Sequence, residues 1–305
     1  MAAKTTLKIG SRKVQVSSLD KVFYPEAGFT KGQVIDYYVN IGPVMLPYLK
    51  GRPVTLKRYP DGVEGGFFYE KQCPSHAPDW ITTTDVEKGN GEIIHYCVIN
   101  DLASLVWAAN IANLEFHSFQ HLGRALTKPT ALVFDLDPGE GTDIRDCCQV
   151  GLWIKDLFEA MELRSFPKTS GSKGLQVVVP LNTATTYEKT KEFAHQVALA
   201  LEQKFPKAVV SNMQKVLRKG RVLVDWSQND DHKTTVCVYS LRAKEQPTVS
   251  TPVTWEEVRK AQKSRKVLSF DAEAVLKRVE KLGDLFEPGL KLKQKLPPLS
   301  ALGEG

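Results

Sequence analysis

The chain has 305 residues, of which 42% are hydrophobic and 25% are charged, a composition that excludes disorder over most of its length. Lys and Arg number 41 against 35 Asp and Glu, a formal net charge of +6 at pH 7 that allows an anionic partner such as nucleic acid without requiring one. Nowhere do about 18 apolar residues follow one another, so we expect no membrane-spanning segment.

Helical and strand patterns alternate along the chain, which favours a mixed α/β protein. A capping box at Thr30 to Gln33 begins the first predicted helix, and a second box at Thr254 to Glu257 begins the last. Between them we expect, in chain order, strands at 53–59, 92–99 and 131–137, a helix at about 143–163, a strand at 175–181, a helix at about 187–205, and strands at 221–226 and 234–240.

The cysteines are odd in number and form no Cys-x-x-Cys pair: Cys73, Cys97, Cys147, Cys148 and Cys237. We therefore expect neither a disulfide framework nor a zinc site, and a reducing cytosol is the simplest compartment for such a chain.

The most informative stretch is the strand 131–137, whose end carries two aspartates separated by one residue, Asp135 and Asp137. Because strand side chains alternate, both carboxylates project from one face. Carboxylates held so close repel each other unless a cation lies between them, and a divalent metal with oxygen ligands is the usual cation. A solvated strand end, or acids that cap the next helix, is the alternative interpretation.

A third aspartate, Asp225, interrupts the apolar strand 221–226. Burying an unpaired carboxylate is costly, so Asp225 requires a cation. If its strand neighbours 131–137, the three aspartates can hold two metal ions that activate a hydroxyl and stabilise a leaving phosphate. A salt bridge to Arg218 or Arg221 is the alternative.

The segment 168–174 reads Lys-Thr-Ser-Gly-Ser-Lys-Gly and leads into the predicted strand 175–181. Its backbone N–H groups, hydroxyls and Lys173 suit a phosphate, although an ordinary loop has a similar composition. His117 lies in an apolar run, where a hydrogen-bonded core histidine is the simpler interpretation. Spacing alone assigns no role to His117 or to Arg242.

Basic and aromatic residues interleave at 57–59 and 67–69. This combination suits contact with a phosphate backbone and stacking on bases. A half-buried sheet face has the same pattern, so both interpretations stay open.

Together, the order Asp-Leu-Asp, Ser-Gly-Ser-Lys-Gly and Val-Asp-Trp resembles the archaeo-eukaryotic primase superfamily, and more closely the polymerase domain of bacterial DNA ligase D and its stand-alone relatives. The resemblance extends from Leu-Asp-Lys-Val-Phe-Tyr-Pro at 19–25 to Ser-Thr-Pro at 250–252. It implies an α/β (α+β), two-lobed primase-polymerase fold with a mixed, largely antiparallel central sheet. We expect one catalytic domain over 1–290 and a flexible C-terminal tail over 291–305.

The resemblance also implies an activity, which is template-directed addition of nucleotides, with ribonucleotides favoured, to fill gaps and extend ends in non-homologous end joining of DNA double-strand breaks. The implied cofactors are two divalent metal ions, Mn²⁺ or Mg²⁺. The implied partners are DNA ends with 3′ overhangs or gaps carrying a 5′-phosphate, NTP or dNTP substrates, and Ku and a DNA ligase. The expected location is the cytoplasm, in association with the nucleoid and with no membrane.

Residue by residue, the resemblance makes three aspartates the catalytic metal ligands, namely Asp135, Asp137 and Asp225. The implied nucleotide contacts are His117 (at the sugar or phosphates), Ser170, Lys173, Gly174 and Arg242. Two early lysines, Lys21 and Lys31, would bind the downstream 5′-phosphate of a gap. Two phenylalanines, Phe67 and Phe68, would lie near the template strand.

One residue departs from the family pattern, because Gln176 stands where a His is common. We expect Gln176 on the strand face opposite Lys173, with an effect on nucleotide affinity or metal preference. Two other functions fit parts of the sequence. One is a phosphohydrolase of the haloacid dehalogenase type, although Pro-Gly follows Asp-Leu-Asp where that family has a small residue and Thr. The other is a non-catalytic DNA-end-binding module.

Overall fold

The computed structural model describes residues 4–264 and 268–302. Its chain forms two compact units, each assembled from three segments of the sequence. Unit 1 consists of Met1–Arg124, Thr234–Ser250 and Phe270–Gly283, and unit 2 of Ala125–Lys233, Thr251–Ser269 and Asp284–Gly305. Neither unit is a continuous stretch of chain.

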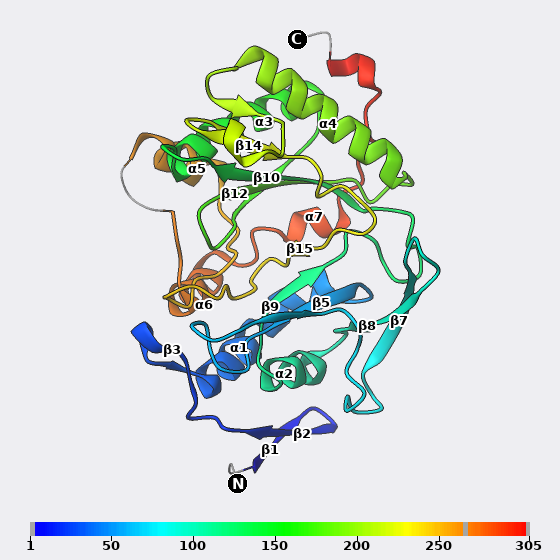
Figure 1. The fold of residues 1–305 in the computed structure, drawn as a ribbon, viewed down its shortest axis with the longest axis vertical. Helices are drawn as coiled ribbons and strands as arrows, with labels where there is room; N and C mark the ends of the chain where they lie inside the picture. The colour runs from blue at the N-terminus through cyan, green and yellow to red at the C-terminus, as the bar shows by residue number, and fades with distance from the viewer. Residues whose placement is uncertain (1–3, 265–267, 303–305) are drawn as a thin grey trace. The chain divides into compact units, whose positions relative to one another are not determined.

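Unit 1 is built on an antiparallel sheet that two helices cover on one face (Figure 1). The strand order is β15 (Thr235–Val236), β9 (Asn113–Ser118), β5 (Pro53–Arg58), β8 (Ile93–Val98) and β7 (Thr82–Glu87), and β6 (Phe68–Glu70) pairs with β5. The covering helices are α1 (Lys31–Leu49) and α2 (Leu102–Asn110). The remaining elements are the hairpins β1 (Lys4–Ile9) with β2 (Arg12–Ser17) and β3 (Val22–Tyr24) with β4 (Phe29–Thr30), and helix α6 (Ala272–Leu282).

The covered face of this sheet is apolar because alternate residues of its strands point toward the helices. Leu114 and Phe116 of β9 are fully buried, and the ring of Tyr38 from α1 packs edge-on against Phe116, 5.0 Å between centroids. The other face therefore carries the intervening residues of β9, Glu115 and His117.

Unit 2 contains a five-stranded sheet in the order β11 (Phe166–Thr169), β12 (Leu175–Pro180), β10 (Ala131–Pro138), β14 (Val222–Asp225) and β13 (Val209–Val210). Only the β13–β14 pair is parallel within this sheet. Helices α3 (Ile144–Ala160) and α4 (Tyr187–Lys204) cover one of its faces (Figure 1). Helix α5 (Trp255–Lys263) packs beside α3, and α7 is Glu287–Lys291.

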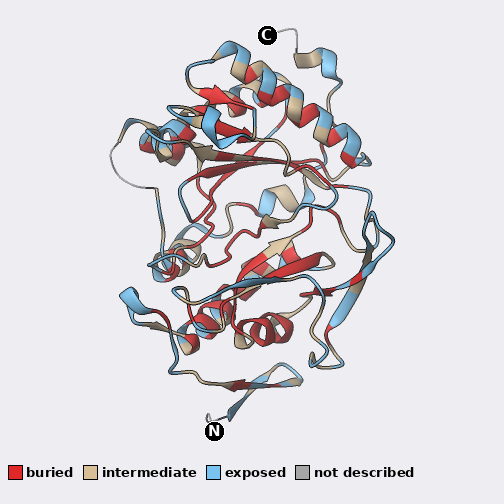
Figure 2. Ribbon diagram, viewed as in Figure 1, coloured by how far each residue is buried: buried red, intermediate tan, exposed pale blue. Residues whose placement is uncertain are grey.

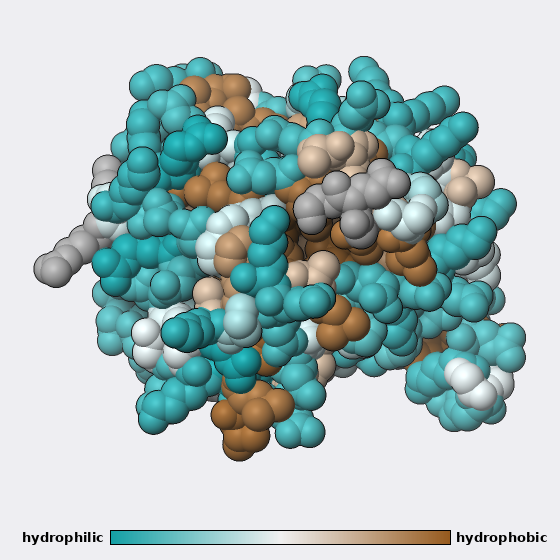
Figure 3. All heavy atoms as spheres, turned by 90° about the horizontal axis from the view of Figure 1, so that it is seen from above, coloured by the Kyte–Doolittle hydropathy of each residue, from teal (hydrophilic) through white to brown (hydrophobic). Residues whose placement is uncertain are grey.

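The buried residues of each unit concentrate between its helices and its sheet (Figure 2). In unit 2, Phe134 of β10 and Phe158 of α3 are both fully buried with ring centroids 5.6 Å apart. Figure 3 shows one face of the molecule, on which hydrophilic side chains predominate and apolar ones gather in smaller groups.

The predicted helices and strands are present, and both capping boxes are formed by the expected residues. The mixed, largely antiparallel architecture is confirmed, although the described strands form two larger sheets, one in each unit, instead of a single central sheet. The strand predicted at 234–240 contains only Thr235–Val236, because the chain turns at Tyr239, whose φ is +67°. Helix α2 was not predicted, although Asp101 and Ser104 form a capping box at its start.

The expectation that the cysteines form no disulfide is wrong for one pair. Cys73, in the loop before β7, is bonded to Cys97 of β8, and the Cys73 N–H donates to the His95 carbonyl, 2.7 Å. This bond closes a loop of 24 residues. Cys147, Cys148 and Cys237 lie outside it, and the spacing of five cysteines gave no indication of which would pair.

The segment 291–305, which we expected to be a flexible tail, contacts unit 2 through its described part. The side-chain amide of Gln294 donates to the carbonyls of Arg164, 3.0 Å, and Pro180, 2.6 Å, and Gln294 is only 8% exposed. Residues 303–305 lie outside the described residues. In the part of the chain that the structure describes, none of the helices has the length and apolar character needed to cross a membrane.

Candidate nucleotidyl-transfer site

Two of the predicted aspartates lie directly opposite each other in unit 2. Strands β10 and β14 are antiparallel neighbours, and their register pairs Asp135 with Asp225. Asp137 follows two residues later on β10, so alternation places it on the same face of the sheet as Asp135. The condition set by the sequence, that the two strands be adjacent, is therefore met.

Asp135 lies where an ionised carboxylate is unfavourable without a cation. Burial and the negative charge of Asp137 raise its pKa to about 7. Its Oδ1 atom is buried and has no hydrogen-bond partner among the described residues. An orphaned carboxylate oxygen beside a second carboxylate is a donor set that suits a hard divalent cation.

Asp225 forms no salt bridge with the two arginines named as alternatives. Its Oδ1 accepts from the Ser227 hydroxyl, 2.6 Å, and its Oδ2 from the Gln228 amide, 3.1 Å. Arg221 pairs instead with Glu202, 3.6 Å, and Arg218 donates to the Met213 carbonyl, 2.6 Å. Neutral donors thus orient the Asp225 carboxylate, which has no ion pair among the residues that the structure describes.

The turn 170–174 packs directly against the strand that carries the aspartates. The Ser170 hydroxyl accepts from the backbone N–H of Ser172, 3.2 Å, and of Gly174, 3.1 Å. Gly174 lies so close to β10 that a Cβ atom there would overlap the Leu136 carbonyl oxygen and would lie 3.6 Å from Asp137 Oδ1. Three of the predicted site residues, Ser170, Gly174 and Asp137, are therefore brought together.

Gln176 lies directly beside a predicted metal ligand. The β10–β12 register places it directly opposite Asp135, its side chain hydrogen-bonds Asp135, and it is 2% exposed. The residue that departs from the family pattern is thus a direct neighbour of a predicted metal ligand.

A second acidic cluster lies in unit 2 beyond β14. Among the described residues, ligand atoms of Asp230, Asp231 and His232 lie within 4.8 Å of one another. Lys191 forms an ion pair with Asp230, so a protein cation already compensates part of this charge. The sequence predicted metal ligands at the other aspartates and not here.

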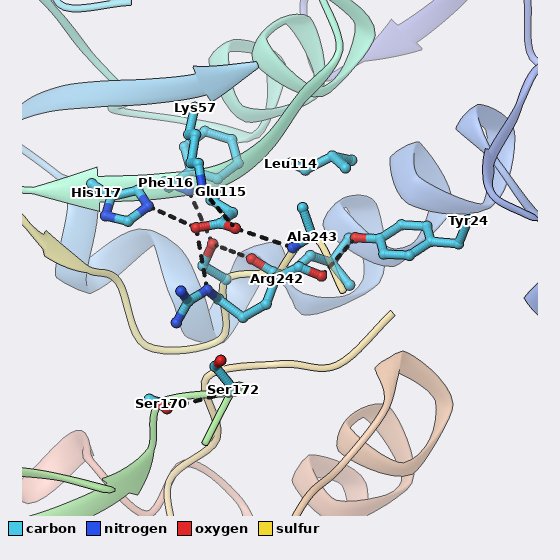
Figure 4. A network of polar contacts seen from close by, with 12 residues as sticks. Tyr24, Lys57, Leu114, Glu115, Phe116, His117, Ser170, Ser172, Arg242 and Ala243 are labelled. Carbon is cyan, nitrogen blue, oxygen red and sulfur yellow. Dashed lines mark hydrogen bonds and ion pairs between the residues drawn. The ribbon is translucent and has the colours of Figure 1, made fainter. Parts of the chain in front are cut away.

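In unit 1, the face of the sheet opposite the covering helices carries a network centred on a residue that sequence reasoning missed, Glu115. Figure 4 shows His117, Lys57 and Arg242 directed toward its carboxylate. The distances are 2.9 Å from His117 Nε2, 3.2 Å from Arg242 Nε and 3.5 Å from Lys57 Nζ. Register explains the arrangement, because β5 and β9 pair Lys57 with Glu115.

The charge state of this network follows from its contacts. Burial raises the pKa of Glu115, but hydrogen bonding from His117 and the charges of Arg242 and Lys57 outweigh burial and hold the pKa well below its ordinary value. Burial also lowers the pKa of His117. The network therefore contains an ionised Glu115 and a neutral His117 near pH 7.

Three buried tyrosines hold the loop that supplies Arg242. The Tyr37 hydroxyl donates to the Tyr239 carbonyl, 2.8 Å. The Tyr24 hydroxyl donates to the Arg242 carbonyl, 3.1 Å (Figure 4). The Tyr38 hydroxyl accepts from the Leu241 N–H, 3.0 Å. The start of α1 and strand β3 thereby fix a loop about two hundred residues further along the chain, which explains why spacing did not assign Arg242.

Lys21 and Lys31 are neighbours in unit 1. The Lys31 N–H donates to the Lys21 carbonyl, 2.8 Å. Lys31 is 6% exposed and burial, aided by the charge of Lys21, lowers its pKa to about 8. Lys21 Nζ pairs with Asp61, 2.8 Å, on a partly exposed surface.

The predicted template residues form an exposed aromatic group. Phe67 and Phe68 are 53% and 44% exposed. Lys57 Nζ lies 4.3 Å from the centre of the Phe67 ring, and the Arg58 guanidinium lies 5.1 Å from that of Phe68. Exposed rings with cations at their faces suit stacking on bases beside a phosphate backbone.

The comparisons with known proteins cover most of the chain. Residues 30–286 match the family model described as LigD, primase-polymerase domain. The multifunctional non-homologous end joining protein LigD of Mycolicibacterium smegmatis is 41% identical over 278 residues, which cover 90% of this chain and 36% of that protein. The bifunctional non-homologous end joining protein LigD of Bacillus subtilis is 34% identical over 292 residues, covering 95% of this chain and 46% of that protein.

A solved structure with the same fold is the polymerase domain from Mycobacterium tuberculosis ligase D in complex with DNA. It has 38% sequence identity and a TM-score of 0.85, and the match covers 91% of this chain and 98% of that chain. The curated relatives are longer than this chain, which spans 36% of one and 46% of another.

Proposed function

Because the chain belongs to the LigD primase-polymerase domain family, we propose that it is a template-directed nucleotidyltransferase that fills gaps and extends DNA ends in non-homologous end joining. The observation that carries the proposal is the pairing of Asp135 with Asp225 across β10 and β14, with Asp137 beside them. Nucleotidyl transfer requires a cluster of carboxylates of this kind at the reacting phosphate.

Asp135, Asp137 and Asp225 would hold two divalent ions, Mn²⁺ or Mg²⁺. When bound, such ions acidify the attacking hydroxyl and offset the charge on the leaving pyrophosphate. Two features of the chain favour binding of these ions. Asp135 Oδ1 is buried without a hydrogen-bond partner among the described residues, and the Ser227 hydroxyl orients the Asp225 carboxylate. Gln176 limits the rotation of the Asp135 carboxylate through its hydrogen bond.

Ser170, Lys173 and Gly174 are proposed contacts of the incoming nucleotide, and the resemblance to the family adds His117 and Arg242. The absence of a side chain at Gly174 keeps the turn against β10 and close to Asp137, and the Lys173 ammonium would contact the phosphates of the nucleotide. Arg242 supplies a guanidinium for phosphate oxygens, and its loop is fixed by tyrosine hydroxyls.

DNA would bind through Lys21 and Lys31 at a downstream 5′-phosphate and through Phe67 and Phe68 at the template. Phosphate contacts supply affinity, and base pairing with the template supplies sequence information. Ku and a DNA ligase are proposed partners, ribonucleotides the favoured substrates, and the cytoplasm with its nucleoid the location, in keeping with relatives named as non-homologous end joining proteins.

The test is extension of a labelled primer on a gapped duplex with Mn²⁺ or Mg²⁺ and with rNTPs or dNTPs. We expect templated addition by the wild type and a loss of at least 100-fold in Asp135→Ala and Asp225→Ala, the size of effect expected when a catalytic metal ligand is removed. Asp156→Ala, which removes an exposed carboxylate of α3, is the matched control and should extend normally.

Binding of the same gapped duplex, followed by fluorescence anisotropy, completes the experiment. The two aspartate variants should bind the duplex about as tightly as the wild type, because the affected carboxylates would contact ions and not DNA. Tight binding by a wild type that adds no nucleotide in either metal would contradict the proposal and favour a non-catalytic end-binding module.

A further inference from the structure

Glu115 is the centre of the unit 1 network and carries no proposed contact with substrate. It is 1% exposed, and beyond its three side-chain partners its Oε1 accepts from the Ala243 N–H, 3.1 Å. A buried carboxylate with this many donors is held in one orientation. Its effect must therefore pass through the groups that it contacts.

The contact with His117 determines which ring nitrogen carries the proton. An ionised carboxylate can only accept hydrogen bonds. Since Glu115 Oε2 lies 2.9 Å from His117 Nε2, Nε2 must be the donor. Burial opposes a second proton on this ring, so in the neutral imidazole Nδ1 has a lone pair and acts as an acceptor.

We propose that Glu115 is a positioning residue that fixes His117 with Nδ1 as a hydrogen-bond acceptor, so that His117 binds a hydroxyl of the incoming nucleotide's sugar and not its phosphates. The inference rests on the proposed function and decides between the two contacts that the sequence left open for His117. Phosphate oxygens near pH 7 are acceptors and repel a second acceptor, whereas a ribose hydroxyl can donate.

Different members of this network would contact different parts of the nucleotide. Arg242 and Lys57 are cations and suit the phosphates, while His117 contributes no charge. Tyr69 lies edge-on to the His117 ring with centroids 6.0 Å apart, which restricts rotation of the ring about its attachment. His117 Nδ1 would then accept a hydrogen bond from a sugar hydroxyl and would have no donor where a hydrogen atom replaces that hydroxyl. This difference is the basis of discrimination between a ribose and a deoxyribose.

The first test reads the tautomer directly, by ¹⁵N NMR of the full chain labelled at histidine, with His117→Gln to assign the signal. In the wild type, Nε2 should show the shift of a protonated nitrogen and Nδ1 that of an unprotonated one. In Glu115→Gln the amide no longer requires a donor at Nε2, so the share of Nδ1-protonated ring should rise. A proton on Nδ1 in the wild type overturns the inference.

The second test adds nucleotides to the same sample. Saturating ATP should shift the Nδ1 signal, and one of the two analogues, 2′-deoxy-ATP or 3′-deoxy-ATP, should fail to do so because it lacks the donor. Equal shifts with ATP and both analogues would overturn the assignment of His117 to a hydroxyl. This readout needs no catalysis, so it separates a failure of the inference from a failure of the proposed polymerase activity.

The third test compares KM and kcat in primer extension for ATP and for the analogue that fails to shift Nδ1. Glu115→Gln should raise KM for ATP about 10-fold, the value of one lost hydrogen bond to a buried partner, and leave KM for the analogue within twofold. Glu70→Gln, which removes another ion-paired glutamate of this sheet, 2.7 Å from Arg58, is the control and should keep the discrimination. If Glu115→Gln raises KM equally for both nucleotides, Glu115 has only a structural role and the inference is wrong.

Discussion

Asp135 lies where the fold disfavours the ionised form of its carboxyl group. Asp135 lies on β10 opposite Asp225 and Gln176, and burial together with the charge of Asp137 raises its pKa to about 7. In the unfolded chain the same carboxyl titrates near its ordinary value of about 4. The folded protein therefore retains a proton between pH 4 and 7 that the unfolded chain has released.

This difference predicts the pH dependence of stability without metal. Because the folded state binds the extra proton, the contribution of Asp135 to the free energy of unfolding should fall as pH rises from about 4 to 7. Asp135→Asn should remove this contribution and be more stable than the wild type at pH 8 by on the order of 3 kcal/mol, with little difference at pH 4. Urea denaturation in EDTA at both pH values measures this.

The exposed acid Asp156 provides the control, since Asp156→Asn should follow the wild type at every pH. Addition of Mn²⁺ at pH 8 should stabilise the wild type and not Asp135→Asn. A difference in unfolding free energy between the wild type and Asp135→Asn that is the same at pH 4 and pH 8 in EDTA would contradict the account of Asp135.

Lys31 gives a second residue-scale prediction, for DNA binding. Burial, with the charge of Lys21, lowers its pKa to about 8, so Lys31 loses its positive charge as pH rises through 8. A terminal phosphate is already a dianion above its second pKa of about 6. The preference for a gapped duplex with a 5′-phosphate over one without should therefore be present at pH 7 and diminish at pH 9.

Fluorescence anisotropy with the two duplexes measures this preference. Lys31→Gln should abolish it at pH 7, whereas Lys50→Gln, a change at an exposed lysine after α1, should not. If Lys31→Gln weakens binding of both duplexes equally, Lys31 does not bind the 5′-phosphate.

At the scale of elements, the turn 170–174 depends on close approach to β10. A Cβ at position 174 would overlap the Leu136 carbonyl oxygen, and backbone cannot yield as a flexible side chain can. We expect Gly174→Ala to cost about 2–4 kcal/mol of unfolding free energy and to impair nucleotide addition. Gly89→Ala, at a position with open space around it, should cost less than 1 kcal/mol in the same thermal or urea measurement. Equal stability of the two variants would refute the close approach.

The Cys73–Cys97 bond ties the loop before β7 to strand β8. A closed loop of 24 residues should contribute about 3 kcal/mol through the entropy of the unfolded chain. Dithiothreitol should therefore lower the Tm of the wild type and leave that of Cys73→Ser unchanged. Thiol titration of the unfolded, unreduced chain should find three thiols, those of Cys147, Cys148 and Cys237. Five thiols would show that the bond does not form.

At the scale of the whole molecule, the net charge of +6 determines long-range attraction to DNA. Each lysine that neutralises a phosphate releases counterions, so the logarithm of affinity should fall linearly with the logarithm of salt concentration. Changing both Lys21 and Lys31 to Gln should reduce the slope by about 2 on a phosphorylated gap. The same double change at Lys260 and Lys277, which are exposed and paired within their helices, should leave the slope nearly unchanged. A slope that both double variants reduce equally would assign binding to net charge alone.

The sequence predicted much of this molecule where the signal was local. Capping boxes at Thr30 and Thr254 placed two helices, alternation placed Asp135 and Asp137 on one face, and ordered motifs identified the family, which the match over residues 30–286 confirms. The mixed, largely antiparallel fold is confirmed by the solved relative. The individual roles of the site residues stay predictions.

The remaining features were decided by contacts between residues distant in sequence. The pairing of Asp135 with Asp225, the contact of Gln176 with Asp135, the Cys73–Cys97 bond and the anchoring of Gln294 all depend on which strands and loops become neighbours. The central position of Glu115 in its network could not be predicted, because the sequence around one acid in an apolar strand does not show which cations will surround it. Periodicity and capping act within a few residues and so are written in the sequence itself, whereas register, burial and the resulting charge states arise only when the sheets form.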